Sequence, residues 1–429
     1  MHFNKILKHT IALKLINTAL VFLINLLMVR LLGVSASGIF FYDVAALSLF
    51  VLLISWSMES GITYYCSKDI GIISTLMLVI LPLLLVQSLI MVIILKFIQF
   101  SVRNYLATIF VMSNITIIYF SAFFYAKKWF VSLNIINCIV NLITALLLFY
   151  WWIKLPVINK GKDYFIIAYV LSCTVQALLY VTVILFETKK TTLSFNTIKP
   201  VAKKIFTYSS IAFITNIAFF LVLRIDYFFV RKYCTDIALS NYVQVSKFGQ
   251  LLILVPSIIG SLIFPYSAGN SIILSMDKVQ QICRTITFSF IAVAVICILA
   301  GSWVFPWMFG NGFNFMYMAL ILYLPGFFSL SIVTVLSANL AGKKLVKVNL
   351  VAVILALVVV VAGDVILIPI GGINAAAAVS SIAYIVCGIY LLWFYKNKFQ
   401  CNTIDFFSIK KQEVLTLLNQ LKKSIIPST

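Results

Sequence analysis

Histidine is almost absent from this chain of 429 residues, because His2 and His9 are the only two and both precede the first long apolar run. The apolar body therefore has no histidine for a metal site or a catalytic dyad. The 8 cysteines form no C-x-x-C pair and mostly lie in or beside apolar runs, as small buried hydrophobic residues do. The G-x-x-x-x-G-K-[ST] phosphate loop is also missing, so nothing indicates ATP hydrolysis. We expect no metal, no cofactor and no catalytic residue.

Charge is equally scarce, at 10% of residues against 63% that are hydrophobic. The 58 residues 285–342 carry no charged side chain, although one crossing of a bilayer needs only about 20 apolar residues. The segment Gly310–Asn314 divides this run into two crossings. Backbone groups in lipid must be satisfied within a helix or a closed barrel, and runs of this length without alternation favour helices. The sequence predicts an all-α polytopic membrane protein.

Gaps between charged residues divide the chain into twelve predicted spans. These are roughly 11–29, 37–58, 72–95, 105–126, 130–152, 164–186, 206–229, 239–264, 285–306, 315–339, 348–369 and 374–395. The eighth is the least regular, because its first half, 241–250, is polar and carries Lys247. The N-terminal apolar run continues to Met28 and ends at Arg30 rather than at a cleavage site, so we interpret it as a retained first helix.

The positions of the basic residues predict the orientation. With a cytoplasmic N-terminus, 21 of the 32 lysines and arginines lie in inner segments, 8 in outer loops and 3 inside spans. This bias predicts that both termini are cytoplasmic. The net charge of +21 is therefore interpreted as topogenic, and nucleic acid is not an expected partner.

The longest inner connection, about 187–205, divides the spans into two sets of six. Short sequence matches between the two sets support this division: Val29-Arg30 ends the first span, and Val230-Arg231 ends the seventh. An even number of spans in each set predicts two similarly oriented lobes around an axis along the membrane normal. We predict an N-terminal lobe over 1–190, a C-terminal lobe over 191–396 and a cytoplasmic amphipathic tail over 397–429. The tail suits a helix on an anionic leaflet, and a solvated tail is the alternative.

Ionisable groups inside spans are the candidate site residues, because each costs about 2.5–3.5 kcal/mol unless it faces protein or water. We predict that a substrate-translocation cavity is lined by Lys14, Arg30, Asp43, Arg224, Asp226 and Lys247, and that Asp364 is a candidate for ion coupling.

Structural interpretations of these residues stay open. Lys14 lies within a turn of the inner surface, where its side chain can snorkel. Arg224 and Asp226 are two residues apart and not on one helix face, so each can pair with another helix instead. Asp364 can be a helix contact between the lobes.

Four segments together resemble the O-antigen and polysaccharide flippases. Leu32–Phe41 is similar to their L-G-x-x-x-x-G-x-[FY] turn, and Met58–Tyr65 to the end of their second span. Arg224–Asp226 resembles their R-x-D element, and Ile368–Ala376 their I-P-x-x-G-x-G-A-A turn, with Asn374 where glycine is usual.

The resemblance covers about residues 5–396 and implies the multidrug/oligosaccharidyl-lipid/polysaccharide (MOP) exporter superfamily, with a MATE-like fold. It implies a flippase that moves an undecaprenyl-diphosphate-linked oligosaccharide, an O-antigen or related repeat unit, across the bacterial inner membrane to its periplasmic leaflet. Implied partners are this lipid, membrane lipids, and the polymerase and chain-length machinery of the same pathway. Basic span residues suit a diphosphate.

Two alternatives remain. A cation-coupled small-molecule or multidrug exporter of the same fold is the first, because acidic and basic groups are equally frequent in mid-span. A membrane glycosyltransferase is the second, although no loop is long enough for a catalytic domain.

Overall fold

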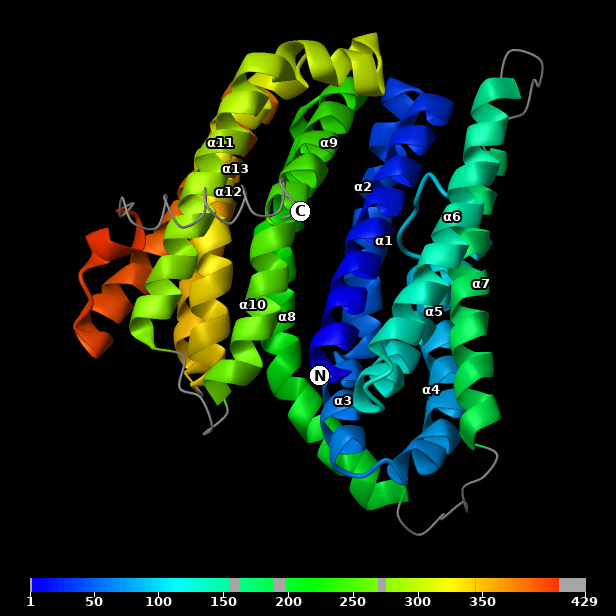
Figure 1. Cartoon of the computed structure of the whole chain (residues 1–429). Coiled ribbons are helices and arrows are strands. Elements are labelled where there is room, and N and C mark those ends of the chain that lie inside the picture. Colours follow the sequence, from blue (N-terminus) through cyan, green and yellow to red (C-terminus); the bar gives the residue numbers. More distant parts are fainter. Residues whose placement is uncertain (1, 155–162, 189–197, 269–274, 344, 409–429) are drawn as a thin grey trace, which may run out of the picture. The chain divides into compact units, whose positions relative to one another are not determined.

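The computed structural model describes residues 2–154, 163–188, 198–268, 275–343 and 345–408. Every regular element in these ranges is a helix, and Figure 1 labels the α-helices. The helices are α1 (His2–Leu32), α2 (Val34–Ser55), α3 (Met58–Lys68), α4 (Ile72–Ile94), α5 (Asn104–Ala126), α6 (Phe130–Lys154), α7 (Asp163–Thr188), α8 (Ile198–Tyr233), α9 (Asp236–Leu252), α10 (Leu254–Ala268), α11 (Met276–Phe309), the short η2 (Asn311–Phe313), α12 (Met316–Gly342), α13 (Val346–Phe399) and the short η3 (Thr403–Phe406).

The described residues contain 10 helices that are long and apolar enough to cross a membrane, or up to 11 if the pair α9 and α10, bent by 45°, forms one span. The prediction of an all-α multi-pass membrane protein is confirmed. The predicted spans fall on these helices, and 348–369 and 374–395 both lie in α13. This helix has 54 residues and is interrupted at Gly372, whose φ is 58°. The exact count of twelve spans stays a prediction.

The predicted second span, 37–58, differs most from the structure in detail. Helix α2 ends at Ser55, and α3 begins at Met58 after a break at Trp56 and Ser57. Neither residue is glycine, yet both are left-handed, with φ of 52° and 49°. No proline or glycine marks this break in the sequence, so the apolar run reads as one helix.

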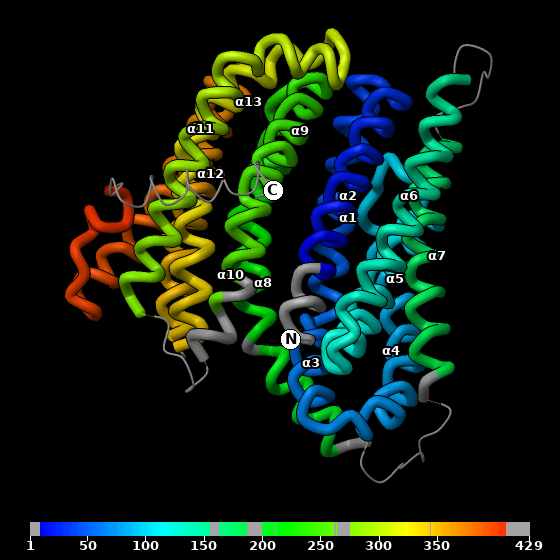
Figure 2. Tube along the Cα trace, in the orientation of Figure 1, coloured from blue at the N-terminus to red at the C-terminus, as the bar shows by residue number. Residues whose placement is uncertain are grey.

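The chain packs as two compact units, which we describe separately. Unit 1 comprises Met1–Val243 and Pro306–Phe313, and unit 2 comprises Gln244–Phe305 and Asn314–Thr429. Helix α8, which is green in Figure 2, packs on α2, α3 and α4 within unit 1. The predicted boundary at 190/191 lies outside the described residues, and the two predicted lobes stay a prediction. Most of the predicted amphipathic tail, from residue 409 on, also lies outside them.

Amide side chains connect the helices of unit 1. Asn141 on α6 donates to Asn17 on α1 at 2.7 Å, and Gln176 on α7 donates to Asn137 on α6 at 2.8 Å. Hydrogen bonds of this kind stabilise helix pairs where lipid supplies no hydrophobic driving force.

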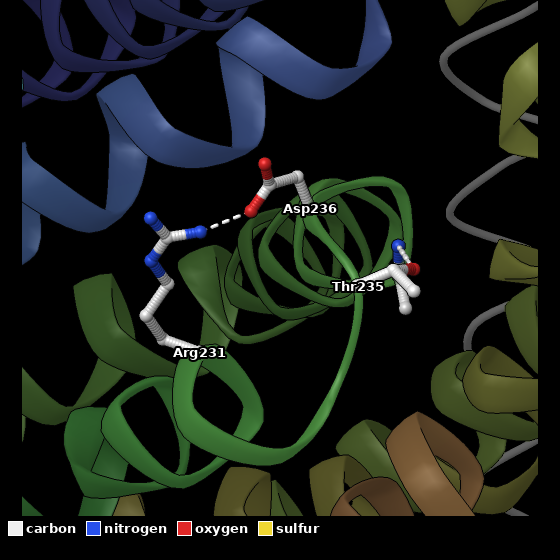
Figure 3. A network of polar contacts seen from close by, with 4 residues as sticks. Arg231, Thr235 and Asp236 are labelled. Carbon is white, nitrogen blue, oxygen red and sulfur yellow. Dashed lines mark hydrogen bonds and ion pairs between the residues drawn. The ribbon is translucent and has the colours of Figure 1, made fainter.

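The turn from α8 to α9 is closed by an ion pair between Arg231 and Asp236, with Thr235 beside it (Figure 3). Arg231 lies in the last turn of α8 and Asp236 in the first turn of α9. Each charge therefore complements the partial charge of its own helix end.

Unit 2 is built on the close packing of α12 against α13. The backbone N–H of Gly326 donates to the Ser381 hydroxyl at 2.6 Å, and the Ser329 hydroxyl donates to the Tyr384 carbonyl at 2.8 Å. A Cβ at Gly326 would lie 2.5 Å from the Cα of Ser381, so only glycine permits this approach. Small residues at a helix crossing are the usual solution in lipid.

Candidate functional site

Unit 1 contains a cavity of about 440 Å³ between α2, α5 and α8, beside the first turn of α3. Its wall combines apolar and polar side chains: Val51, Leu52, Ile118, Phe219, Phe220 and Leu223 with Ser48, Ser55, Glu59, Asn114, Asn216 and Arg224. Ligand pockets usually have about 300–1,000 Å³ and this mixture of apolar surface with a few polar groups.

Arg224 is the cationic group of the cavity. It lies in the middle of α8 and is half-buried. One guanidinium nitrogen donates to the hydroxyl of Tyr227, and the guanidinium carbon lies 5.0 Å from the centre of the Tyr227 ring. Tyr227 is fully buried, so its position is fixed by packing. A cation held over a buried ring in this way has a defined place on the cavity wall.

Glu59 brings a carboxylate to the same cavity. It occupies the first turn of α3, where the partial positive charge of a helix N-terminus favours an anion. Its Oε2 is buried and accepts no hydrogen bond from the residues that the structure describes. A buried carboxylate oxygen without a donor is costly, and such atoms are frequent at functional sites.

Sequence reasoning missed Glu59 as a site residue. The predicted second span ends at residue 58, so Glu59 lies just outside the spans in which charged residues are candidates. The cavity residues Asn114 and Asn216 were missed too, because an uncharged amide in a span is much less conspicuous than a charge. Polar residues inside the predicted spans 105–126 and 206–229 were the available signal.

The break between α2 and α3 is held by three other helices. Gln87 on α4 donates to the Ile54 carbonyl at 2.8 Å and to the Tyr119 hydroxyl at 2.7 Å. Tyr119 on α5 donates to the Ser55 carbonyl at 3.1 Å. These bonds satisfy carbonyls that α2 leaves without an intrahelical partner at its C-terminus.

Helix α8 holds the other side of the break. Trp56 donates through Nε1 to the Ser210 hydroxyl at 2.9 Å, and Asn216 donates to the Ser57 hydroxyl at 3.1 Å. Two left-handed residues cost about 1–3 kcal/mol each and persist only where their surroundings over-determine them. The break therefore fixes Ser55 and Glu59, which flank it, on the cavity wall.

Arg224 and Asp226 lie in different surroundings, as their spacing predicts. Asp226 is fully buried and accepts a hydrogen bond from the Tyr242 hydroxyl, so it joins α8 to the part of α9 that belongs to unit 1. It does not line the cavity that Arg224 lines.

The three other predicted residues of unit 1 also lie away from this cavity. Asp43 is buried and accepts from the backbone N–H groups of Ser101 and Val102, at 2.8 and 3.2 Å, so it orders the chain before α5. Lys14 is exposed on α1.

Arg30 donates to the carbonyls of Met308 (2.8 Å) and Trp307 at the end of α11. Carbonyls at a helix C-terminus carry partial negative charge, so Arg30 caps them.

Lys247 and Asp364 belong to unit 2. Lys247 is half-buried on α9, and Asp364 is fully buried on α13. Their predicted roles in translocation and coupling stay predictions. Across the described ranges, no group of three or more histidine, cysteine, aspartate or glutamate residues is arranged to hold a metal ion.

No protein-family model matches the chain, and no curated protein matches it in sequence. Solved structures of the same fold do match. The lipid II flippase MurJ in an inward closed conformation aligns at a TM-score of 0.72 and 16% identity, over 98% of this chain and 93% of that one.

Multidrug transporters share the fold as well. An inward-facing MATE transporter of the MOP superfamily aligns at a TM-score of 0.68 and 13% identity, over 89% of this chain and 94% of that one. The Vibrio cholerae MATE transporter VcmN aligns at 0.59 and 12%, over 94% and 99%. Identities this low show the fold alone, which this chain shares with MurJ and with these MATE transporters.

Proposed function

We propose that this protein is a flippase of the MOP superfamily that moves an undecaprenyl-diphosphate-linked oligosaccharide, an O-antigen or related repeat unit, from the cytoplasmic to the periplasmic leaflet of the bacterial inner membrane. The observation that carries the proposal is the guanidinium of Arg224 on the wall of a 440 Å³ cavity inside a membrane-spanning unit. MurJ, a lipid II flippase, has the same fold.

The chemistry of Arg224 suits a diphosphate. A guanidinium presents paired N–H donors that match two phosphate oxygens, and it stays charged at any physiological pH. Asn114 and Asn216 add amide groups on the same wall. The apolar side chains on the cavity wall lower the local dielectric constant, so the electrostatic attraction is stronger there than in bulk solvent.

The proposal includes the topology predicted from the charges: twelve spans, both termini cytoplasmic, and two lobes of six spans. Lys14, Arg30, Asp43, Asp226 and Lys247 remain proposed contributors to the translocation route, and Asp364 to coupling. Within unit 1, Arg224 is the member of this set that lines the described cavity.

The test uses reconstituted vesicles and a fluorescent short-chain prenyl-diphosphate disaccharide. Flipping is measured as loss of protection from an external quencher. Arg224→Ala should slow flipping by about 10- to 100-fold, since a charge-assisted hydrogen bond contributes about 1.5–3 kcal/mol. Arg224→Lys should restore part of the rate.

Arg103→Ala is the matched control, because Arg103 is exposed and pairs with Asp163 away from the cavity. An unchanged rate in Arg224→Ala, at equal protein per vesicle, would refute the role of Arg224.

A cation-coupled small-molecule exporter is the second candidate, and Glu59 favours it. A buried carboxylate on the same wall suits a cationic drug or a coupling ion. In that case Glu59→Gln should abolish export of a cationic dye from the same vesicles, while Arg224→Ala should leave it intact.

A further inference from the structure

A set of stacked aromatic rings lies where the end of α2 and helix α3 pack against α8. We call Trp56, Tyr64, Phe206, Tyr208 and Phe213 the aromatic ladder. Trp56 stacks on Phe213 with ring centres 4.1 Å apart and planes within 17°, and on Phe206 at 5.7 Å and 9°. Tyr64 stacks on Tyr208 at 4.7 Å and 9°. Four of the five rings are exposed, and Phe206 has 51% of its surface accessible.

The backbone that holds one of these rings, at Trp56, is strained. Trp56 is left-handed at the α2–α3 break, and the hydrogen bond from its Nε1 to Ser210 fixes the plane of the indole. Residues held in such conformations are typical of ligand-binding positions, because the strain persists only where the surroundings impose it. The ladder is thus a preorganised stack of rings, and its most accessible members are Phe206, with 51% of its surface exposed, and Tyr208, with 40%.

The ladder is continuous with the cavity along one face of α8. Phe206, Phe213 and Phe220 recur every seven residues, which places them on the same face of the helix. Phe220 lines the cavity together with Arg224. Phe213 and Arg224 are 11 residues apart, so about 16 Å of helix axis separates them.

We propose that the aromatic ladder is a saccharide-binding platform. Pyranose rings present C–H groups on their faces, and the negative face of an aromatic ring attracts the partial positive charge of such groups. A diphosphate-linked saccharide with its phosphates at Arg224 would extend its sugars along α8 onto these faces. The inference rests on the proposed function, in which Arg224 binds the diphosphate of the same ligand.

Polar groups at the ladder suit the same ligand. Tyr64 and Tyr208 carry hydroxyl groups, and Lys68 on α3 donates to the Tyr64 hydroxyl at 2.6 Å. That hydrogen bond raises the pKa of Lys68, and the residue is exposed beside the ladder. Aromatic residues at a membrane interface also serve as lipid-facing anchors. Interfacial anchoring alone does not account for the left-handed backbone at Trp56 or for the hydrogen bond from its Nε1 to Ser210.

The experiment compares two probes on the full-length protein in nanodiscs: farnesyl diphosphate, and farnesyl diphosphate linked to an N-acetylglucosamine disaccharide. Wild type should bind the glycosylated probe more tightly. Phe206→Leu and Tyr208→Leu should each reduce this difference by about twofold to tenfold and leave farnesyl diphosphate binding unchanged. Trp56→Phe, which keeps a ring, should retain most of the difference.

Phe97→Leu is the matched control, since Phe97 is 84% exposed and lies outside the ladder. If the glycosylated probe keeps its full advantage in Phe206→Leu and Tyr208→Leu, the ladder is only an interfacial anchor and the inference is wrong. If the disaccharide adds no affinity in wild type, the inference is also wrong, although Arg224-dependent binding of both probes would still support the proposed function. If wild type binds neither probe, both the inference and the proposed function are wrong.

Discussion

Gln87→Leu should destabilise unit 1 by about 1 kcal/mol, because the part-buried Ile54 carbonyl loses its donor, while removal of the Gln87 Oε1, which is buried without a partner among the described residues, offsets part of that cost. Leucine fills a volume similar to that of the amide, so the expected cost is the unsatisfied carbonyl rather than a cavity. The Tyr119 hydroxyl also loses the hydrogen bond that it accepts from Gln87. It still donates to the Ser55 carbonyl, which limits the loss of stability.

The assay is unfolding of the purified protein in mixed micelles, followed by tryptophan fluorescence as the fraction of denaturing detergent increases. Ser88→Ala is the control: Ser88 is the next residue on α4, and its hydroxyl donates to the Leu85 carbonyl of its own helix. It should change stability by less than about 0.5 kcal/mol. Tyr119→Phe should cost a similar amount to Gln87→Leu.

The double variant should depart from additivity by more than about 0.5 kcal/mol, because Gln87 and Tyr119 form one network. If Gln87→Leu is no more destabilising than Ser88→Ala, the break is not stabilised by these carbonyl bonds.

Three further predictions follow from the sequence and the packing. Gly61→Leu should prevent stable insertion or folding, since even a Cβ there would lie 2.7 Å from the Ser209 hydroxyl and 2.8 Å from the Ile205 carbonyl oxygen; normal protein levels in membranes would contradict this. Reporter fusions at Gly161 and Gly312 should indicate the periplasm, and fusions at Thr191 and Thr429 the cytoplasm; a periplasmic signal at Thr191 would end the twelve-span topology. A membrane potential alone should drive flipping, because two negative charges gain about 4–5 kcal/mol on leaving a cell at 100 mV. Flipping that responds to a proton or sodium gradient but not to the potential would replace that account with ion antiport.

Span positions were predictable because a bilayer imposes a length and a composition that a single sequence displays. The predicted span 105–126 and α5, Asn104–Ala126, differ by one residue at one end. The break at Trp56 was not predictable, since its cause lies in side chains of α4, α5 and α8 rather than in local glycine or proline.

Charged residues in spans identified where unusual contacts occur but not which kind. Asp43, Asp226 and Arg224 carry the same signal in the sequence, a charge in an apolar run. In the structure, Asp43 binds two backbone amides, Asp226 binds a tyrosine and Arg224 lines the cavity. The partners of Asp43 and Asp226 are distant in sequence, and whether Arg224 lines the cavity depends on the helix face that it occupies. A single sequence cannot rank the three roles.

The break at Trp56 and Ser57 also governs how this part of the chain fits the thickness of the membrane. A straight helix over residues 34–68 would have 35 residues and a length of about 52 Å, against about 30 Å of hydrocarbon. Such mismatch is relieved by tilting or by deforming the bilayer. Because α2 ends at Ser55, it alone, with 22 residues or about 33 Å, matches the hydrocarbon. The more polar α3 is then free of that constraint, and neither tilt nor local thickening of the lipid is needed to accommodate the segment.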